Sequence, residues 1–461
     1  MKSENIVEGP QNKMGYMPIP KLILNMSLPM MFSMFILALY NIVDSIFVSK
    51  INEDALTAVS LAFPVQNLMT SFAVGTGVGV NALLSRRLGE RNHEEANKTA
   101  NHAIFLAICT AVVFIVIGYF ALPIYLKSQT SNQAIIEYGL QYLKIVVYCC
   151  PVMFVGITCD RLLQSTGRTV YTMWSQIAAA VTNTIFDPLF IFGIGFFPKL
   201  GVTGAAVATI LGQFVGLVVS FTFNITKNID IKLSFKRFRP EGKIVGEIYK
   251  VGIPSILLSS ITSVTTYFMN LILGAFTSTA IAVYGVYFKL NSFVFMPVFG
   301  LNGGIVPILA YNYGAKKKDR IYQTIKVSLL MACGIMLFGT AIFEIFPAVL
   351  LKLFSASDSM LEIGVPAMRI IASSFIGAAF AISFSSVFQA FGKAIWSMII
   401  SFARQVIVFI PVAYLFSKTG NLNLIWLCFP IAEVMSVSLA LIYMGKLNKT
   451  VLKPLAKLEE K

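Results

Sequence analysis

The sequence predicts an all-α polytopic membrane protein, with twelve transmembrane helices in two pseudo-symmetric six-helix bundles. Three observations predict this fold class: an apolar composition, long apolar segments and an internal repeat. Of the 461 residues, 57% are hydrophobic and only 12% are charged, and the mean hydropathy is +0.77. Soluble domains carry about 25% charged residues. The solvent around most of this chain is therefore lipid.

The apolar segments are long enough to span a bilayer as helices. About 20 apolar residues cross a hydrocarbon core that is about 30 Å thick. The segments do not alternate as the strands of a membrane β-barrel do. We expect helices at residues 22–48, 55–83, 101–125, 135–159, 171–196, 203–225, 250–276, 280–309, 324–351, 360–388, 396–417 and 424–446.

The basic residues predict the orientation in the membrane. Of the 36 Lys and Arg residues, 27 lie at the termini and in the loops on one side, and five lie in the loops on the other. Cytoplasmic loops carry such an excess. We therefore expect a multi-pass protein of the bacterial inner (cytoplasmic) membrane with both termini cytoplasmic. The net charge of +15 is then a topology signal that attracts membrane lipids, and no nucleic-acid partner is expected.

Two further features limit the chemistry. The first 20 residues are polar, so no cleavable signal peptide is predicted. The six cysteines all lie in apolar segments without metal-ligand spacing, and we interpret them as packing residues.

A single constant shift aligns the two halves of the chain. The shift that places Pro29 on Pro254 also pairs Gly75 with Gly300, Gly79 with Gly304, Gly89 with Gly314, and Gln164 and Gly167 with Gln389 and Gly392. Six helices per half place both halves in the same orientation. The predicted bundles are thus parallel repeats around a central cleft, an arrangement that permits alternating access.

The repeat sets the predicted domain boundaries. They are a cytoplasmic N-terminus (1–21), an N-terminal bundle (22–225), a cytoplasmic linker (226–249), a C-terminal bundle (250–446) and a cytoplasmic tail (447–461). The glycine-rich stretch at residues 75–79 is interpreted as close helix packing. No Walker lysine follows it, so a transporter of this kind draws its energy from an ion gradient.

Two acidic residues inside predicted spans are the main candidates for a functional site. A carboxylate in a membrane span is costly unless it is paired or protonated. Asp44 lies in the first helix. Asp187 lies in the fifth, four residues after Asn183 and so on the same helix face. The repeat equivalents are Met269 and Val412. This asymmetry predicts a role that is specific to the N-terminal bundle.

Other charged residues in the spans have simpler interpretations. Arg404 and Glu433 are expected to form a structural ion pair in the C-terminal bundle. Lys289 aligns with Pro64, and we expect it to pair with an acid or with backbone carbonyls, a structural role. Lys289→Gln would then lower the protein yield without changing selectivity. If Lys289 instead binds or gates substrate through its charge, the same change would alter which cations are exported.

Several motifs together resemble the multidrug and toxic compound extrusion (MATE) family, and most closely its MepA-like bacterial branch. They run in order along nearly the whole chain: Ser27-Leu-Pro29-Met, Asn41-Ile-Val-Asp44, Gly75-Thr-Gly77-Val-Gly79, Ser85-Arg86-Arg87-Leu-Gly89, Gln164-Ser-Thr-Gly167, Asn183-Thr-Ile-Phe-Asp187-Pro188, Gly201-Val-Thr-Gly204, Pro307-Ile-Leu-Ala-Tyr-Asn312 and Gln389-Ala-Phe-Gly392.

The resemblance implies a secondary active multidrug efflux antiporter that exports organic cations in exchange for H+ or Na+. It implies xenobiotic transport, with antibiotic resistance as a consequence, and neither an enzyme activity nor a cofactor beyond the coupling ion. The implied ion-coupling residues are Asp44, Asp187, Asn183, Tyr40 and Thr209. Na+ is a candidate ion at Asp44, Asn183 and Asp187, and no other metal is expected. By helix position, Phe154, Gln66 and Met269 are expected at the drug site. We expect a monomer whose partners are small organic cations and drugs.

Two other function classes remain as alternatives. A lipid-linked oligosaccharide flippase of the same superfamily needs several basic residues in its spans, and only Lys289 and Arg404 lie deep here. An intramembrane enzyme needs clustered acids for Mg²⁺ or a nucleophile with a base. Dye efflux from proteoliposomes under an imposed gradient separates these classes, and also separates an exchanger from a channel.

The predicted topology can be tested with single cysteines in a cysteine-free background. Tags at Lys2 and Lys236 should be protected from an impermeant thiol reagent applied outside intact cells, whereas a tag near Ser278 should react. Labelling at Lys236 in intact cells would contradict the orientation.

Overall fold

The computed structural model describes residues 12–234, 238–354 and 356–455, and within these ranges the chain is helical without β-strands. The positions proposed for labelling at Lys2 and Lys236 lie outside the described residues. The N-terminal half forms α1 (Ile19–Ser49), α2 (Glu53–Gly89), α3 (His93–Gln129), α4 (Gln133–Tyr148), α5 (Cys150–Ser165), α6 (Thr169–Phe192) and α7 (Val202–Thr226) after a short 3₁₀ turn at Lys13–Gly15.

The C-terminal half repeats this order. It forms α8 (Gly242–Gly274), α9 (Ser278–Gly314), α10 (Lys318–Ile345), α11 (Pro347–Lys352), α12 (Asp358–Ala372), α13 (Phe375–Ala390), α14 (Ala394–Phe402), α15 (Ile410–Ser417), α16 (Leu422–Ile425) and α17 (Cys428–Leu447), with π-helical segments at Ala403–Phe409 and Asn448–Leu452.

The described helices support the predicted spans. Nine helices are long and apolar enough to cross a membrane, and the pairs α4–α5 and α12–α13 bring the number to eleven if each pair is one span. The remaining predicted span corresponds to α6, whose 24 residues include the polar Asn183 and Asp187. Twelve membrane-spanning segments therefore agree with this fold.

The two broken spans bend at equivalent places in the repeat. The α4–α5 break, at Cys149, bends by 48°, and the α12–α13 break, at Ser373 and Ser374, bends by 47°. Pro151 accounts for the first break, because it lacks the N–H of a regular helix. At the second break, the hydroxyls of Ser373 and Ser374 donate to backbone carbonyls three residues earlier and so compete with the helix ladder.

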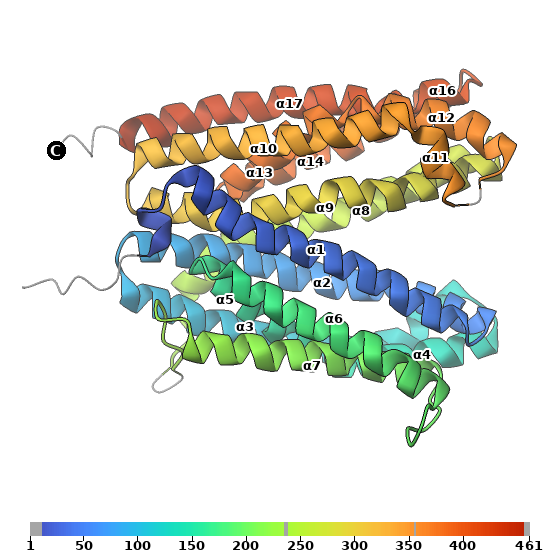
Figure 1. Cartoon of the computed structure of the whole chain (residues 1–461), viewed down its shortest axis with the longest axis horizontal. Helices are drawn as coiled ribbons and strands as arrows, with labels where there is room; N and C mark the ends of the chain where they lie inside the picture. Colours follow the sequence, from blue (N-terminus) through green and yellow to red (C-terminus); the bar gives the residue numbers. More distant parts are fainter. Residues whose placement is uncertain (1–11, 235–237, 355, 456–461) are drawn as a thin grey trace, which may run out of the picture.

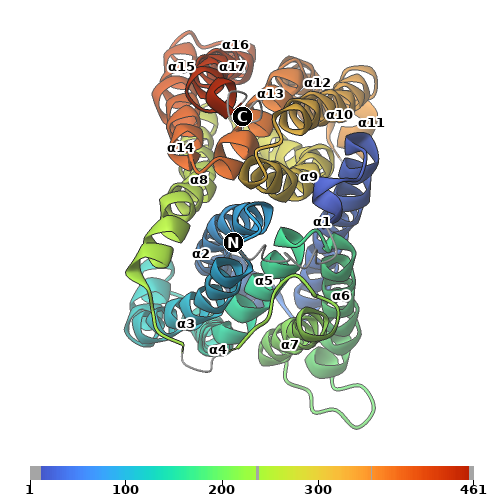
Figure 2. The ribbon, with the colours of Figure 1, turned by 90° about the vertical axis from the view of Figure 1, so that its left-hand side faces the viewer.

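Figure 1 shows the two halves as two bundles, with both termini at the same end. We call this the terminal end; it carries residues 12–17, 90–92, 227–234, 238–241 and 315–317. From this end, Figure 2 shows α9, α10 and α17 on one side and α2, α3 and α7 on the other, with α1 along one edge and α8 along the opposite edge, each running between the two sides. Toward the opposite end, α1 runs away from α9 (Figure 1).

The first helix of each half begins in the packing of the other half. Ile19 and Ile23 of α1 are buried in the core of the C-terminal bundle. Their repeat equivalents in α8, Ile244 and Ile248, are buried with α2 and α3 of the N-terminal bundle. The halves predicted from the sequence as 22–225 and 250–446 are thus sequence repeats whose first helices cross between the two cores.

The glycines paired by the repeat lie at the seam between the bundles. A Cβ on Gly79 would lie 2.2 Å from the Ile248 carbonyl oxygen of α8, and one on Gly304 would lie 2.5 Å from Ser27 Oγ of α1. Gly75 meets Ile256 and Gly300 meets Met31 in the same reciprocal way. The expectation that these glycines permit close helix packing is confirmed.

This packing yields a prediction for the seam. Gly79→Ala should lower the apparent Tm of the purified protein, because overpacking a tight contact costs about 1–3 kcal/mol. Gly246→Ala is the matched control: it lies within α8 and has no atom within 4 Å of an added Cβ. An equal Tm for the two variants in a fluorescence melting assay would contradict the proposed close contact.

Candidate functional site

Asp187 and Asn183 form the centre of a buried polar site in α6. Their side chains are 0% and 2% exposed, and four residues of helix place them on one face. Pro188 follows and has no N–H, so the carbonyl of Thr184 lacks its helical partner. The sequence thus places two side-chain groups and a backbone acceptor near one another inside a membrane span.

The helix α7 completes one side of this site. With its amide oriented to satisfy both neighbours, Asn183 donates to Asp187 Oδ2 at 3.1 Å and accepts from the backbone N–H of Thr209 at 3.3 Å. Gly212 permits this approach, since a Cβ there would lie 2.7 Å from the carbonyl oxygen of Ala179. The predicted partners Asn183, Asp187 and Thr209 are therefore brought together.

The helix α1 supplies the second carboxyl group. Asp44 and Asp187 lie close enough for their side chains to share a hydrogen bond. One oxygen of Asp44, Oδ1, is buried and has no hydrogen-bond partner among the described residues. Two carboxyl groups this close inside a bundle are strongly disfavoured when both are ionised. The pair is thus suited to hold a proton or a monovalent cation.

Aromatic hydroxyls and an amide surround the two acids. Tyr40 and Tyr142 both lie near the two carboxyls. Gln66 donates to the hydroxyl of Tyr142 at 3.1 Å, and the side chain of Thr209 lies near that hydroxyl. The sequence analysis predicted Tyr40 but not Tyr142. Tyr142 is one of 17 tyrosines and belongs to no distinguishing motif, so the sequence alone does not mark it as a site residue.

The site is rich in oxygen atoms from uncharged groups as well as from carboxylates. Hydroxyl, amide and carboxylate oxygens are the ligands that hard cations prefer. In the described part of the chain, no three His, Cys, Asp or Glu residues lie together in a way that could hold a metal ion. The oxygen atoms gathered here can accept a proton or contact a small cation.

The residues predicted for the drug site are not brought together. Phe154 is 2% exposed and packs against Phe114 inside the N-terminal bundle. Met269 is buried in the core of the C-terminal bundle. Gln66 lies beside the acid site through its bond to Tyr142.

The predicted pair in the C-terminal bundle is confirmed. Arg404 Nη1 lies 3.0 Å from Glu433 Oε2, and the Glu433 side chain is 9% exposed. Arg404 belongs to the π-helical segment Ala403–Phe409. This ion pair neutralises both charges, so Glu433 is not available as a free carboxylate.

The segment before α1 connects both bundles at the terminal end. Asn12 donates to the Thr166 carbonyl at 2.9 Å and to Asp230 Oδ1 at 3.1 Å. The C-terminal bundle binds the same segment from the other side. There, Asn312 donates to the Met14 carbonyl at 3.0 Å, Arg320 to the Met17 carbonyl at 2.7 Å, and Lys317 to the Gly15 carbonyl at 2.7 Å. Residues 12–17 thus hold the two bundles together at this end.

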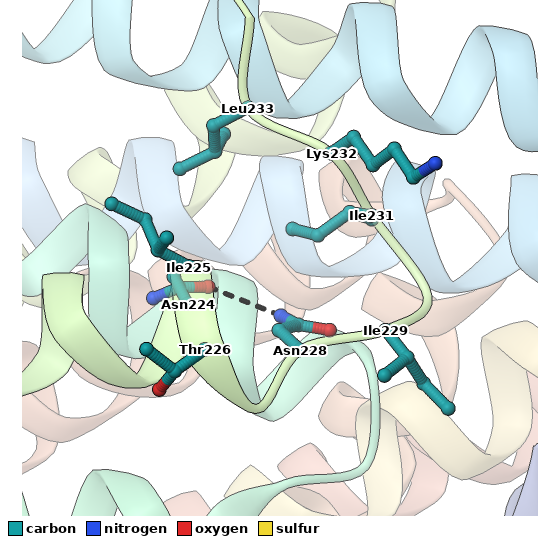
Figure 3. Close-up of a pocket in the computed structure, with 8 residues that line it drawn as sticks. All are labelled: Asn224, Ile225, Thr226, Asn228, Ile229, Ile231, Lys232 and Leu233. Atoms are coloured by element: carbon teal, nitrogen blue, oxygen red, sulfur yellow. Dashed lines mark hydrogen bonds between the residues drawn. The ribbon is translucent and has the colours of Figure 1, made fainter.

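A separate pocket of about 370 Å³ lies between the end of α7 and the linker (Figure 3). Asn228 donates to Asn224 there at 3.1 Å. The lining residues are Asn224, Ile225, Thr226, Asn228, Ile229, Ile231, Lys232 and Leu233. All of them come from α7 and the segment that follows it, so this pocket is distinct from the acid site.

The fold and the acid site together define a class of protein: a helical membrane transporter built from two bundles. A sequence model of the MatE family matches residues 29–189 and 254–415, and the two matches begin at the prolines that the repeat pairs, Pro29 and Pro254. The chain therefore belongs to the MatE family of multidrug efflux transporters.

The relatives extend over most of the chain. The multidrug export protein MepA of Staphylococcus haemolyticus is 25% identical over 423 residues, which are 91% of this chain and 92% of that protein. The MepA of Staphylococcus aureus strain MRSA252 is 26% identical over 420 residues, 89% of this chain and 90% of that protein. The FAD transporter of Shewanella oneidensis is 26% identical over 424 residues, 91% and 92% of the two chains.

Solved structures have the same fold. An outward-facing multidrug resistance MATE family transporter of the MOP superfamily superposes with a TM-score of 0.89 at 23% identity, covering 97% of this chain and 99% of that one. A MOP superfamily transporter from Pyrococcus furiosus also gives 0.89 at 23% identity, covering 96% and 99%. The resemblance to a MepA-like MATE transporter is confirmed.

Lys13, in the segment of residues 12–17 that contacts both bundles, gives a prediction for how protein stability depends on pH. Burial and, to a lesser extent, the Arg168 guanidinium lower the pKa of Lys13 from 10.5 to about 8. The unfolded chain therefore binds more protons than the folded protein between these values, so this group makes stability rise with pH across that window. Lys13→Met removes the dependence.

We expect the Tm of Lys13→Met, relative to that of the wild type, to be highest near pH 7 and to fall as the pH approaches 10.5. Lys21→Met, at an exposed position of α1, is the control. A pH-independent difference for Lys13→Met in a melting series would contradict this account.

Proposed function

We propose that this protein exports amphipathic drugs, organic cations among them, in exchange for H+ or Na+ by alternating access. The observation that carries the proposal is the acid pair Asp44–Asp187, which lies with the buried Asn183 and Thr209 in the N-terminal bundle. Met269 and Val412 occupy the equivalent positions of the other bundle. An ion site in one bundle and a pair of bundles that meet along a seam are the two parts that an exchanger requires.

The proposed coupling acts through α1. Asp44 lies on α1, and Asp187 and Asn183 lie on α6. A proton or a cation shared by the two carboxyls removes their repulsion and draws α1 toward α6. The start of α1 lies in the core of the C-terminal bundle, so a shift of α1 changes the seam. Coupling requires only that the ion binds the two states of the seam with different affinities.

The proposed orientation follows from the basic residues. With the terminal end in the cytoplasm, the glycine seam and residues 12–17 hold the cytoplasmic side together in this state. Cargo then exchanges with the opposite, external side. The MepA relatives are named for multidrug export, so we propose drugs as the cargo of this protein. The relative named FAD transporter indicates that the fold also accepts an anionic cargo.

A gradient-swap experiment tests the proposal. Purified protein in proteoliposomes should move ethidium uphill under either an imposed pH gradient or an imposed Na+ gradient, which also identifies the coupling ion. A channel equilibrates the dye without concentrating it, and a flippase or an enzyme ignores the gradient. Absence of uphill transport under both gradients would refute the exchanger.

The acid pair provides the sharper prediction. Asp187→Asn and Asp44→Asn should fold and still bind dye, but lose gradient-driven export by about tenfold or more. Typical coupling free energies between two sites change affinity by about 5- to 150-fold, and the expected loss lies in this range. Glu433→Gln should reduce yield more than coupling, because it leaves the half-buried Arg404 without its partner inside a membrane span. Wild-type rates of concentrative efflux by purified Asp187→Asn would exclude the proposed role.

A further inference from the structure

Lys289 of α9 faces the N-terminal bundle. It lies one helical turn before Phe293, whose ring centroid is 6.3 Å from that of Phe35 on α1. Gly300, on the same face of α9, lies against Met31 of α1. The helical period of 3.6 residues places Lys289 on this stripe of α9, about 16 Å along the axis from the first residue of the helix. Lys289 therefore lies on the stripe of α9 that carries these contacts with α1.

The expected ion pair of Lys289 is not found. Lys289 is exposed, and no acidic side chain of the described residues forms an ion pair with its ammonium group. Its aromatic neighbour is the ring of Phe354, whose centroid lies 5.9 Å from Nζ. A lysine at this depth without a carboxylate is costly. The structural pairing predicted from the sequence is thus wrong for the described residues.

Exposed aromatic surface lies one helical turn from Lys289 along α9. Phe35 and Phe293 are 44% and 43% exposed although they contact each other across the two bundles. Phe293 lies one helical turn from Lys289 on α9, and Phe35 lies on α1, which runs away from α9 toward the end opposite the terminal end (Figure 1). Planar ring systems stack on such faces. One cation beside two exposed rings is a suitable arrangement for an aromatic molecule that carries a negative charge.

The other charges in the bundles do not neutralise Lys289. Glu433 is bridged to Arg404, and Asp187 is buried within the N-terminal bundle. The repeat equivalent of Lys289 is Pro64, so the N-terminal half supplies no matching cation. The positive charge is confined to one side of the space between α1 and α9.

We propose that Lys289, Phe35 and Phe293 form a recognition site for cargo that combines a planar aromatic ring with an anionic group such as a carboxylate or a phosphate. The ammonium group binds the anion and the two phenyl rings hold the aromatic plane. This inference rests on the proposed transport function and specifies the class of cargo. The anionic headgroup of a lipid offers the same charge without the aromatic ring, and the test separates the two.

Equilibrium binding to the purified full-length protein in detergent provides the test without requiring a gradient. Carboxyfluorescein serves as the aromatic anion and ethidium as the aromatic cation, both followed by fluorescence anisotropy. We expect Lys289→Gln to weaken carboxyfluorescein binding about five- to tenfold, the loss of one charge-assisted contact. Ethidium binding should change less than about twofold on the same scale.

Two further variants complete the design. Lys289→Arg keeps the charge and should retain carboxyfluorescein binding. Lys352→Gln removes an exposed lysine of α11 and should leave both dyes unaffected. Ethidium binding by each variant confirms that it is folded.

Several results would overturn the site. They are no carboxyfluorescein binding by the wild type, an equal loss for both dyes in Lys289→Gln, or the same selective loss in Lys352→Gln. Displacement of the dye by phosphatidylglycerol from the wild type but not from Lys289→Gln would identify a lipid-headgroup site instead. Failure of the proposed exchange appears separately, as absent uphill ethidium transport with selective dye binding intact.

Discussion

The close contact between the first helix of each half and the second helix of the other half is the constraint on which this structure depends. Gly79 allows the carbonyl of Ile248 to approach, and Gly304 allows Ser27 to do so. The two contacts are related by the repeat, so the halves meet as reciprocal surfaces. Because packing at this distance leaves no room for a Cβ, the seam is either closed or separated, and it has few intermediate arrangements. A seam of this kind can act as a two-state element.

The helix α1 connects this seam to the acid site, because it packs against both bundles. The beginning of α1 is buried with the C-terminal bundle, and its later part carries Asp44 beside Asp187. One rigid helix therefore contacts both the proposed ion site and the opposite bundle. This gives the proposed coupling a direct physical route, since a change in charge at Asp44 acts on a helix that belongs to both cores. Residues 12–17 come directly before the same helix and hold the two bundles together at the terminal end.

The proposed cargo site lies where the same helices separate. Phe35 of α1 and Phe293 of α9 form a ring contact between these helices, and Lys289 lies one turn beyond it. Closing the opposite end would bring α1 against this lysine, so cargo at Lys289 and an ion at Asp44 would act on the same helix. The two proposals then describe one motion, in which each ligand favours a different position of α1.

The sequence by itself determined the membrane class, the two repeats, the nature of the paired glycines and the acid site at Asp44, Asn183 and Asp187. These features were predictable because they depend on spacing along the chain: apolar length, a helical period, and one constant shift between the halves. Tertiary structure alone decided the rest. It placed Tyr142 beside the acids, exchanged α1 and α8 between the cores, and left Lys289 exposed instead of paired. Such features depend on which helix faces come together, and this is set by packing between segments that are far apart in the sequence.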